Sequence, residues 1–528
     1  MRRQTFETLT LKKIVGGGQA LGTLADGRKC FVWGGLPGET VTVRITKKKS
    51  HFVEAIVEEV ISLSPDRIQP RDPDSYLSTS PWQIMPLEVE QTYKRQLIND
   101  AFMLHNVALP AVIDIYCDNV AYGYRNKVEF SWYSESVASR AVSQKKSGLA
   151  LAGPGLLSDD TRGVNTHSDR DGLSGDTLDL AFFRRGSKSK IVVNGTSLTH
   201  PEINNLARAI RDLLRHKHIS ARQLKTLLIR CDQSGSCVWQ LYIKDHLPEI
   251  ITADEAAKLP AQGGEIIYSD PRSPASRITE RLVHFGDTTL TDTILGVPFR
   301  YACEGFFQIN IPVYEQALRD MQQWTGRDYS DQQRAISQKK SGQHRESKQH
   351  GSSNSFSEGF AFPASVRQER QLDQLAARRP EEKDVCEAGE PTLDFYAGVG
   401  TIGLTIGGGN VTLVEINADA VREMQRNIAE LDRTDARAVL APSEQALDYI
   451  TGKEIVIVDP PRAGLHSDVI ATLLQKLPPR IIYLSCNPVT QARDVSLLQE
   501  KYEIIHYQGY NFFPRTPHIE HLVILDKK

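Results

Sequence analysis

The sequence predicts an α/β protein whose C-terminal part forms a doubly wound, Rossmann-like sheet, preceded by a small β-barrel and a central α+β region. Three observations favour this class. Apolar runs near the C-terminus each end in a glycine-rich or polar turn, helical spacing separates these runs, and glycine-rich alternating segments lie near the N-terminus. A length of 528 residues suits about two to four domains.

Residues 1–62 are expected to form the barrel, of the OB-like kind. Val41 and Val43 alternate with polar residues, as a half-buried strand requires, and glycines cluster on both sides of the preceding segment. Small barrels of this kind often bind oligonucleotides. The next turn would carry three consecutive lysines at its tip, Lys47, Lys48 and Lys49. These lysines are either a solvated turn or contacts to nucleic-acid phosphates.

Residues 63–300 are expected to form the central α+β domain. Helical spacing runs through residues 87–106 and 203–214, and residues 227–243 have the pattern of a hairpin. Arg125 and Lys127 stand close to aromatic residues in the sequence. Basic and aromatic side chains together favour a contact with RNA.

Two segments interrupt the globular pattern, at about 137–176 and about 328–389. They are poor in large apolar residues, so burial cannot offset the entropy of ordering, and we expect both to be mostly disordered. Residues 141–148 and 335–342 are near-repeats of each other. Two explanations of this repeat stay open: the two segments are related inserted sequences, or they carry the same short docking motif.

Residues 301–528 are expected to form the doubly wound domain. The strand that ends near Tyr396 runs into Gly398-x-Gly400-x-x-Gly403, and the next strand ends at Glu415. A glycine turn followed by an acid that grips ribose hydroxyls is typical of nucleotide cofactor sites. This pattern alone does not separate a nicotinamide cofactor from S-adenosylmethionine.

Two further strand ends favour methyl transfer to a planar base. Asp459-Pro460-Pro461 follows one apolar run, and two prolines give a rigid backbone that can face a ring. Arg462 comes next, where amino-methylating enzymes have an aromatic residue. Cys486 follows another run, and a thiolate that adds to C6 of uracil would make C5 nucleophilic. Glu520 precedes an apolar strand and suits removal of the C5 proton.

Composition and charge limit which other classes of protein this chain can belong to. The net charge is −2 and the pI is near 6.7, so nucleic acid would have to bind a local patch. We see no signal peptide and no membrane span, and seven scattered cysteines suit a reducing compartment. A cytoplasmic location and a monomer are expected, with no metal site.

The chain resembles the RNA 5-methyluridine (uracil-C5) methyltransferase family, in the TRAM-containing type that acts on ribosomal RNA. The segments that carry the resemblance are Tyr124 to Lys127, Gly305 to Asn310, Leu393 to Thr401, Val414 to Asn417, Asp459 to Gly464, Ser485 to Pro488 and Phe513 to Glu520.

The resemblance implies roles for individual residues. Cys486 would be the nucleophile and Glu520 the base. S-adenosylmethionine would be held by Gln308, Tyr396, Gly398, Gly400, Thr401, Glu415 and Asp459. RNA would be contacted by Lys47, Lys48, Lys49, Arg125, Lys127 and Arg462.

The chain departs from the family at the four cysteines that usually hold an iron–sulfur cluster. Asp72, Ser78, Pro81 and Ser197 stand at the corresponding positions. A cluster needs thiolate ligands, so no iron–sulfur cluster is expected.

The predicted function is S-adenosylmethionine-dependent methylation of C5 of a uridine in RNA, with 23S ribosomal RNA favoured by the TRAM-like barrel. The alternatives are methylation of the transfer RNA T-loop and a catalytically idle RNA-binding adaptor. A dehydrogenase would leave the Cys486 and Asp459 sites unexplained.

Overall fold

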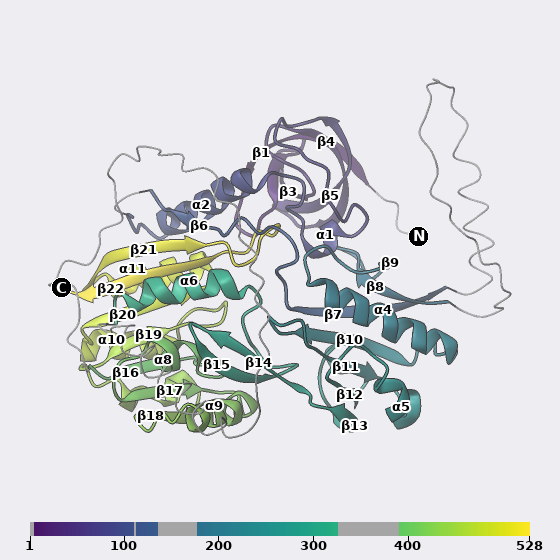
Figure 1. Ribbon diagram of the computed structural model, residues 1–528. Helices are drawn as coiled ribbons and strands as arrows, with labels where there is room; N and C mark the ends of the chain where they lie inside the picture. Colours follow the sequence, from purple (N-terminus) through teal and green to yellow (C-terminus); the bar gives the residue numbers. More distant parts are fainter. Residues whose placement is uncertain (1–4, 110–111, 136–176, 326–389) are drawn as a thin grey trace, which may run out of the picture.

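The structure is a computed structural model that describes residues 5–109, 112–135, 177–325 and 390–528. The segments predicted to be disordered, with their near-repeat, lie outside the described residues. Three bodies of secondary structure are visible in Figure 1: a barrel at the top, a central sheet at the right and a larger sheet with helices at the lower left. The predicted fold class is confirmed.

The barrel closes in the order β1-β2-β3-β5-β4. Its interior is filled by the alternate residues of each strand, such as Val32, Val41 and Val43, which have no exposed surface. The strands are β1 (Phe6–Ile14), β2 (Ala20–Thr23), β3 (Lys29–Trp33), β4 (Thr40–Lys48) and β5 (Phe52–Ser62). Lys47 and Lys48 lie on β4 itself, and only Lys49 lies in the turn where the sequence placed all three.

The central body is a seven-stranded sheet in the order β13-β12-β11-β10-β7-β8-β9. The amphipathic helix α4 (Pro201–His216) covers β8, β10 and β11 with its apolar side. The strands are β7 (Lys127–Glu135), β8 (Thr177–Phe183), β9 (Lys190–Val192), β10 (Leu224–Cys231), β11 (Cys237–Ile243), β12 (Gly263–Tyr268) and β13 (Glu280–Gly286). Short helical turns are α1 (Tyr76–Thr79), η1 (Pro248–Ile250) and α5 (Ala253–Ala256).

The largest body is an eight-stranded sheet in the order β18-β17-β16-β19-β20-β22-β21-β6. Its strands are β16 (Thr392–Phe395), β17 (Val411–Glu415), β18 (Ala436–Leu440), β19 (Ile455–Val458), β20 (Arg480–Ser485), β21 (Tyr502–Tyr510), β22 (Glu520–Lys527) and β6 (Ile115–Tyr116). The five strands β16 to β20 are parallel, and β22 runs antiparallel to β20. This is the doubly wound sheet that the sequence predicted.

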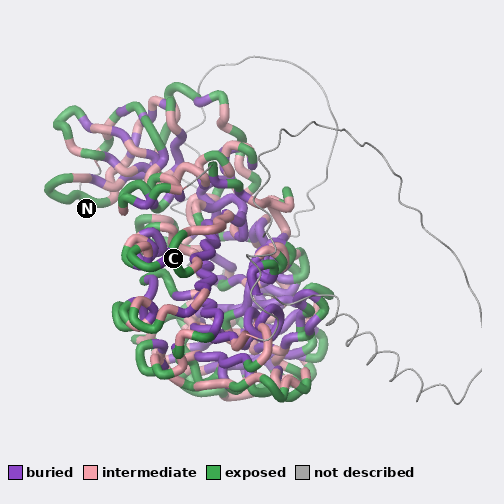
Figure 2. The backbone as a smooth tube through the Cα atoms, turned by 90° about the vertical axis from the view of Figure 1, so that its left-hand side faces the viewer, coloured by how far each residue is buried: buried purple, intermediate pink, exposed green. Residues whose placement is uncertain are grey.

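Helices lie on both faces of this sheet and bury one apolar core on each face (Figures 1 and 2). They are α6 (Ile311–Gln322), α8 (Thr401–Ile406), α9 (Ala418–Glu430), α10 (Ser467–Lys476), α11 (Pro488–Leu498) and, from the region before residue 300, α2 (Leu87–Leu104). Two short turns, η2 (Ser443–Gln445) and η3 (Leu447–Tyr449), follow β18. The hairpin of β14 (Thr289–Ile294) and β15 (Val297–Ala302) joins the two bodies by packing on α9.

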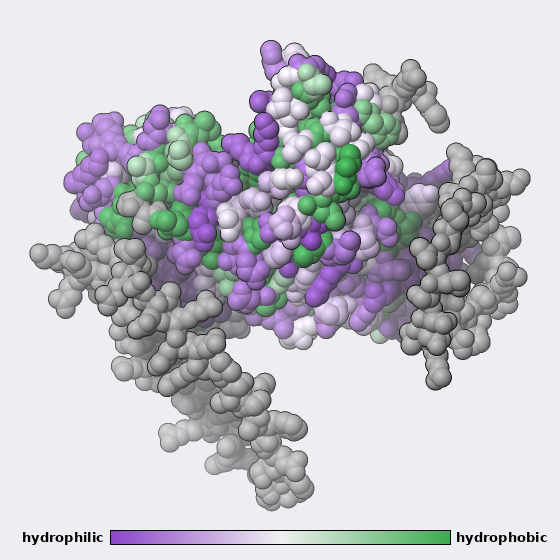
Figure 3. Space-filling model, turned by 90° about the horizontal axis from the view of Figure 1, so that it is seen from above, coloured by the Kyte–Doolittle hydropathy of each residue, from purple (hydrophilic) through white to green (hydrophobic). Residues whose placement is uncertain are grey.

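The surface over the barrel side intersperses hydrophilic and hydrophobic residues (Figure 3). Among the helices that the structure describes, none combines the length and the apolar character needed to cross a bilayer.

Candidate active site

Cys486, Asp459 and Glu520 meet at one edge of the large sheet. Asp459 and Cys486 directly follow the parallel strands β19 and β20, whose carboxyl ends lie side by side. β22 runs the opposite way, so its first residue, Glu520, lies at the same edge. The register pairs Ser485 with His521 and therefore brings the neighbouring Cys486 close to Glu520.

Burial and neighbouring charges raise the pKa values of the two carboxyl groups and the thiol. Glu520 is 5% exposed, and burial, followed by the charge of Asp459, raises its pKa well above the usual value. Burial also raises the pKa of Asp459 to about 7. The pKa of Cys486 rises to about 11, mainly through burial and then through the charges of Glu520 and Asp459. Such perturbed groups at a strand edge are typical of a catalytic site.

Arg462 is the positive charge of this group. Its charge lowers the pKa of Cys486 and of Glu520, against the effect of burial. Its guanidinium lies 3.0 Å from Nδ1 of His518, and the Asn487 side chain donates to its carbonyl oxygen at 2.8 Å. Arg462 is therefore held from two sides while it stays exposed to the cavity.

The glycine turn lies at the ends of β16 and β17. Gly398 and Gly400 have φ of 58° and 90°, in the left-handed region that glycine adopts easily. The Glu415 carboxylate accepts from the backbone N–H of Gly398 at 3.0 Å and of Asn417 at 2.8 Å. The acid and the glycine turn thus form one rigid unit. Thr401 begins α8, and its hydroxyl lies 2.8 Å from the Tyr314 hydroxyl.

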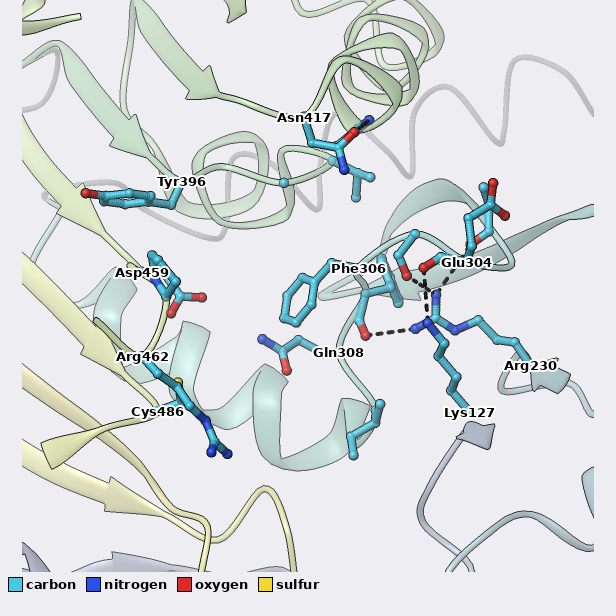
Figure 4. A pocket seen from close by; sticks show the side chains of 18 of the residues that line it. Lys127, Arg230, Glu304, Phe306, Gln308, Tyr396, Asn417, Asp459, Arg462 and Cys486 are labelled. Carbon is cyan, nitrogen blue, oxygen red and sulfur yellow. Dashed lines mark hydrogen bonds between the residues drawn. The ribbon is translucent and has the colours of Figure 1, made fainter. Parts of the chain in front are cut away.

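A loop from the central body, residues 302–308, forms the opposite wall. The Arg230 guanidinium donates to the carbonyl oxygens of Gly305 at 2.7 Å and Phe307 at 3.2 Å, and the Lys127 ammonium donates to that of Glu304 at 3.1 Å. Figure 4 shows these contacts and the Phe306 ring that the loop presents to the cavity. Phe306 is 71% exposed.

Three residues of this wall were missed by sequence reasoning: Asn126, whose amide donates to the Gln308 carbonyl at 3.0 Å, Arg230 and Phe306. A signal existed for Arg230, because it interrupts the apolar run of β10, and a charge there needs buried partners. Lys127 was predicted to contact RNA. That contact stays a prediction; the Lys127 ammonium also holds the loop, and burial lowers its pKa to about 8.

A cavity of about 1380 Å³ runs between the large sheet and the central body and brings most predicted residues together. Its lining includes Arg125, Lys127, Gln308, Tyr396, Gly398, Glu415, Asp459, Arg462, Cys486 and Glu520. Thr401 lines a small adjoining space. The three lysines lie outside, on the exposed surface of the barrel, where the Lys47 ammonium is 2.7 Å from Glu54.

Two of the four positions expected to lack cluster ligands, Asp72 and Ser197, belong to a hydrogen-bonded group around the Asp72 carboxylate. This carboxylate accepts from the hydroxyls of Thr196 at 3.1 Å and Ser197 at 2.9 Å, from the Ser197 backbone N–H at 3.0 Å and from the Gln83 amide at 3.1 Å. Carboxylate and hydroxyl oxygens do not fit an iron–sulfur cluster, which needs thiolates. That no cluster binds stays a prediction.

Comparison with known proteins agrees with this geometry. Residues 393–528 match the family model described as tRNA (Uracil-5-)-methyltransferase, and residues 3–57 match that of the TRAM domain. An uncharacterized RNA methyltransferase of Nitratidesulfovibrio vulgaris is 25% identical, over 98% of this chain and 96% of that protein. One of Halalkalibacterium halodurans is 24% identical, over 98% and 95%.

Among solved structures, the chain is similar to the tRNA (uracil-54, C5)-methyltransferase of Pyrococcus abyssi in complex with S-adenosyl-L-homocysteine. The TM-score is 0.65 at 16% identity, over 98% of this chain and 100% of that one. At this identity the likeness concerns the fold. The comparisons support the resemblance predicted from the sequence: the chain carries a TRAM domain and a domain that matches the tRNA (Uracil-5-)-methyltransferase model, and its relatives are named RNA methyltransferases.

Proposed function

We propose that the chain methylates C5 of a uridine in RNA through a covalent Cys486 adduct, with S-adenosylmethionine as the methyl donor. The observation that carries this proposal is the meeting of a thiol and a buried carboxyl on adjacent strand ends, inside a cavity that also holds the glycine turn. One group can add to the ring while the other removes a proton from it.

The residues of the glycine turn fit the donor. Both Glu415 oxygens already accept one backbone N–H each, and each oxygen keeps a lone pair that can accept a ribose hydroxyl. Tyr396, Gly398 and Gln308 line the same cavity and would hold the rest of the molecule. Bound S-adenosylmethionine supplies an electrophilic methyl group and a positive sulfonium charge.

Cys486 begins the reaction. Its thiolate forms a bond to C6 of uracil, and the electron pair of the C5=C6 bond moves into an enolate that makes C5 nucleophilic. C5 then takes the methyl group, which leaves S-adenosylhomocysteine. Arg462 favours the thiolate over the thiol, because its charge acts on Cys486.

Glu520 completes the turnover. In its ionised form it takes the proton from C5, the C5=C6 bond re-forms, and the C6–S bond breaks to release the Cys486 thiolate. Burial and the nearby Asp459 make Glu520 a stronger base than an exposed carboxylate. The raised pKa thus suits the role that the site needs.

The target uridine must leave its stack to reach a thiol inside a cavity. Arg125 and Arg462 line the route with positive charge, and the exposed Phe306 offers a face on which a base can stack. Lys127 adds charge at the wall while its ammonium holds the loop. The barrel lysines would add phosphate contacts outside the cavity.

For the RNA, we propose 23S ribosomal RNA, on the basis of the TRAM-like barrel. Transfer RNA is the second candidate, favoured by the description of the family model. An idle adaptor is disfavoured because both Cys486 and Glu520 are present and meet in the cavity.

The test is to map 5-methyluridine in ribosomal and transfer RNA from a strain that lacks the gene. One site should lose its methyl group, and a plasmid with the wild-type chain should restore it, whereas Cys486→Ala should not. Loss in transfer RNA alone would assign the second candidate. No change in any RNA would overturn the proposed function.

A further inference from the structure

A group of metal-ligating side chains lies in the central body, outside the cavity. His200 and Glu202 stand at the N-terminus of α4, and Cys231 ends β10. One ligand atom from each of these three residues lies within 4.8 Å of the other two. Imidazole, carboxylate and thiol in such a cluster are the ligand types of a zinc site.

Cys237 lies next to this group of three, beside Cys231, and is the candidate for a fourth ligand, although its thiol is not within 4.8 Å of all three. It begins β11 directly opposite Cys231, and the two thiols lie within hydrogen-bonding reach of each other. Both cysteines are buried, at 0% and 2% exposure. Each thiol also donates to a carbonyl oxygen: Cys231 to that of Asp232 at 3.1 Å and Cys237 to that of Gly235 at 3.7 Å.

The two α4 residues are available as ligands. His200 occupies the N-cap position, yet its imidazole makes no capping hydrogen bond to the helix. Glu202 lies over the β10–β11 turn, with its side chain about 4 Å from where a Cβ on Gly235 would lie. Within the described residues, no ion pair ties up the Glu202 carboxylate.

We propose that His200, Glu202, Cys231 and Cys237 bind a zinc ion that fastens the start of α4 to the β10–β11 hairpin. Four protein ligands and no open position make a structural site. Binding releases the two thiol protons to solvent. Two thiolates and one carboxylate around Zn²⁺ leave a net charge of −1, which suits the positive end of a helix.

The site would stabilise a part of the molecule on which the active-site wall depends. Arg230, which holds the 302–308 loop, directly precedes Cys231 in β10. On the other side, the backbone N–H of His200 and the hydroxyl of Thr199 both donate to the carbonyl of Arg125. A metal at this point would therefore fix two segments that reach the RNA cavity.

The sequence did not predict this site. The spacing His200-x-Glu202 followed by Cys231 and Cys237 matches no familiar zinc pattern, because the ligands come from a helix start and a hairpin. The same cross-strand thiols are also the natural pair for a disulfide, which would exclude the metal.

The test uses the full chain, purified without chelators and with any affinity tag removed. Elemental analysis should find about one zinc per chain. Replacement of zinc by Co²⁺ should give the charge-transfer and d–d bands of tetrahedral thiolate-bound cobalt. Chelation by EDTA should lower the melting temperature of the wild-type protein.

Two variants define the ligands. Cys231→Ala with Cys237→Ala should reduce zinc to background and abolish the cobalt bands. Glu202→Gln, at an exposed position, should keep the fold and weaken zinc binding by about 10-fold or more. Cys30→Ala, which removes a buried thiol from the barrel, is the matched control and should keep full zinc.

Zinc far below one equivalent in the wild-type chain, equal zinc in the double variant, or a native Cys231–Cys237 disulfide would each overturn the proposal. The readouts are metal content, cobalt spectrum and thermal stability, so they stand apart from any result on RNA methylation. The same elemental analysis reports iron, and near-stoichiometric iron with sulfide would contradict the expectation that no cluster binds.

Discussion

Two acidic groups in this molecule have opposite environments. The Asp72 carboxylate accepts four hydrogen bonds, from Gln83, Thr196 and Ser197. Asp459 and Glu520 instead face each other and a thiol, and among the described residues neither carboxyl receives a hydrogen bond. Burial raises the pKa of both carboxyls, and the charge of Asp459 raises that of Glu520 further.

This contrast distinguishes a carboxylate with a structural role, Asp72, from carboxyls with a proposed catalytic role, Asp459 and Glu520. A carboxylate that accepts several hydrogen bonds from protein donors stabilises the fold, because each donor would lose its partner without it. Carboxyls that are buried, close together and directed into a cavity destabilise the empty protein but are ready for proton transfer. The comparison therefore predicts opposite results for substitutions in the two groups.

Of the substitutions in these two acidic groups, Asp459→Asn should reduce activity most and cost least stability. Methylation should fall by at least about 100-fold, because the charge that faces Cys486, Glu520 and the substrate is lost. The raised pKa means that the folded state disfavours ionised Asp459, so this carboxyl costs stability as pH rises from about 4 to about 7. The stability of Asp459→Asn should therefore not fall in this way between about pH 4 and about pH 7.

The measurement for Asp459→Asn is single-turnover methylation together with the urea midpoint on both sides of this pH range. Reduced stability above about pH 7 would mean that Asp459 plays the structural part assigned to Asp72.

Asp72→Ala should give the reverse result. It leaves the donors of Thr196, Ser197 and Gln83 without their acceptor, and we expect a loss of about 1–3 kcal/mol in the free energy of unfolding. Methylation per folded molecule should stay near the wild-type value. Asp74→Ala, at an exposed position two residues away, serves as the control in urea denaturation. Equal stability of the two variants would refute a structural role for the Asp72 group.

Alkylation of Cys486 should depend strongly on pH. With a pKa of about 11, the thiol is mostly protonated at neutral pH, so the reactive thiolate rises about 10-fold per pH unit below that value. The rate of iodoacetamide labelling at Cys486, followed by peptide mass spectrometry, measures this. A rate that levels off near neutral pH would show that Arg462 outweighs burial and the two carboxyls.

The barrel lysines should have the smallest effect. Combined Lys47→Ala, Lys48→Ala and Lys49→Ala should weaken RNA binding and reduce the slope of log affinity against log salt by about 0.7 per lost phosphate contact. Lys47 already has Glu54 as a partner, so its own share should be the least. Lys12→Ala with Lys13→Ala, on the exposed face of β1, is the control. An unchanged slope would identify the three lysines as a solvated turn.

The sequence predicted the elements that are local in the chain. The alternation of apolar and polar residues predicted the barrel strands, and the apolar runs before Asp459 and Cys486 predicted the strand ends. These signals depend only on residues that are neighbours in the sequence. The contacts of Arg230, Asn126 and Asp72 could not be predicted from the sequence, because their partners lie in distant segments that come together only in the folded protein.

The most direct test of the central claim is the fate of the covalent adduct. Glu520→Gln, mixed with substrate RNA and S-adenosylmethionine, should methylate the uridine but fail to remove the C5 proton. A protein–RNA adduct that survives denaturing electrophoresis should therefore accumulate, and Cys486→Ala should form none. Methylation by Cys486→Ala at the wild-type rate, or rapid turnover by Glu520→Gln without an adduct, would contradict the account.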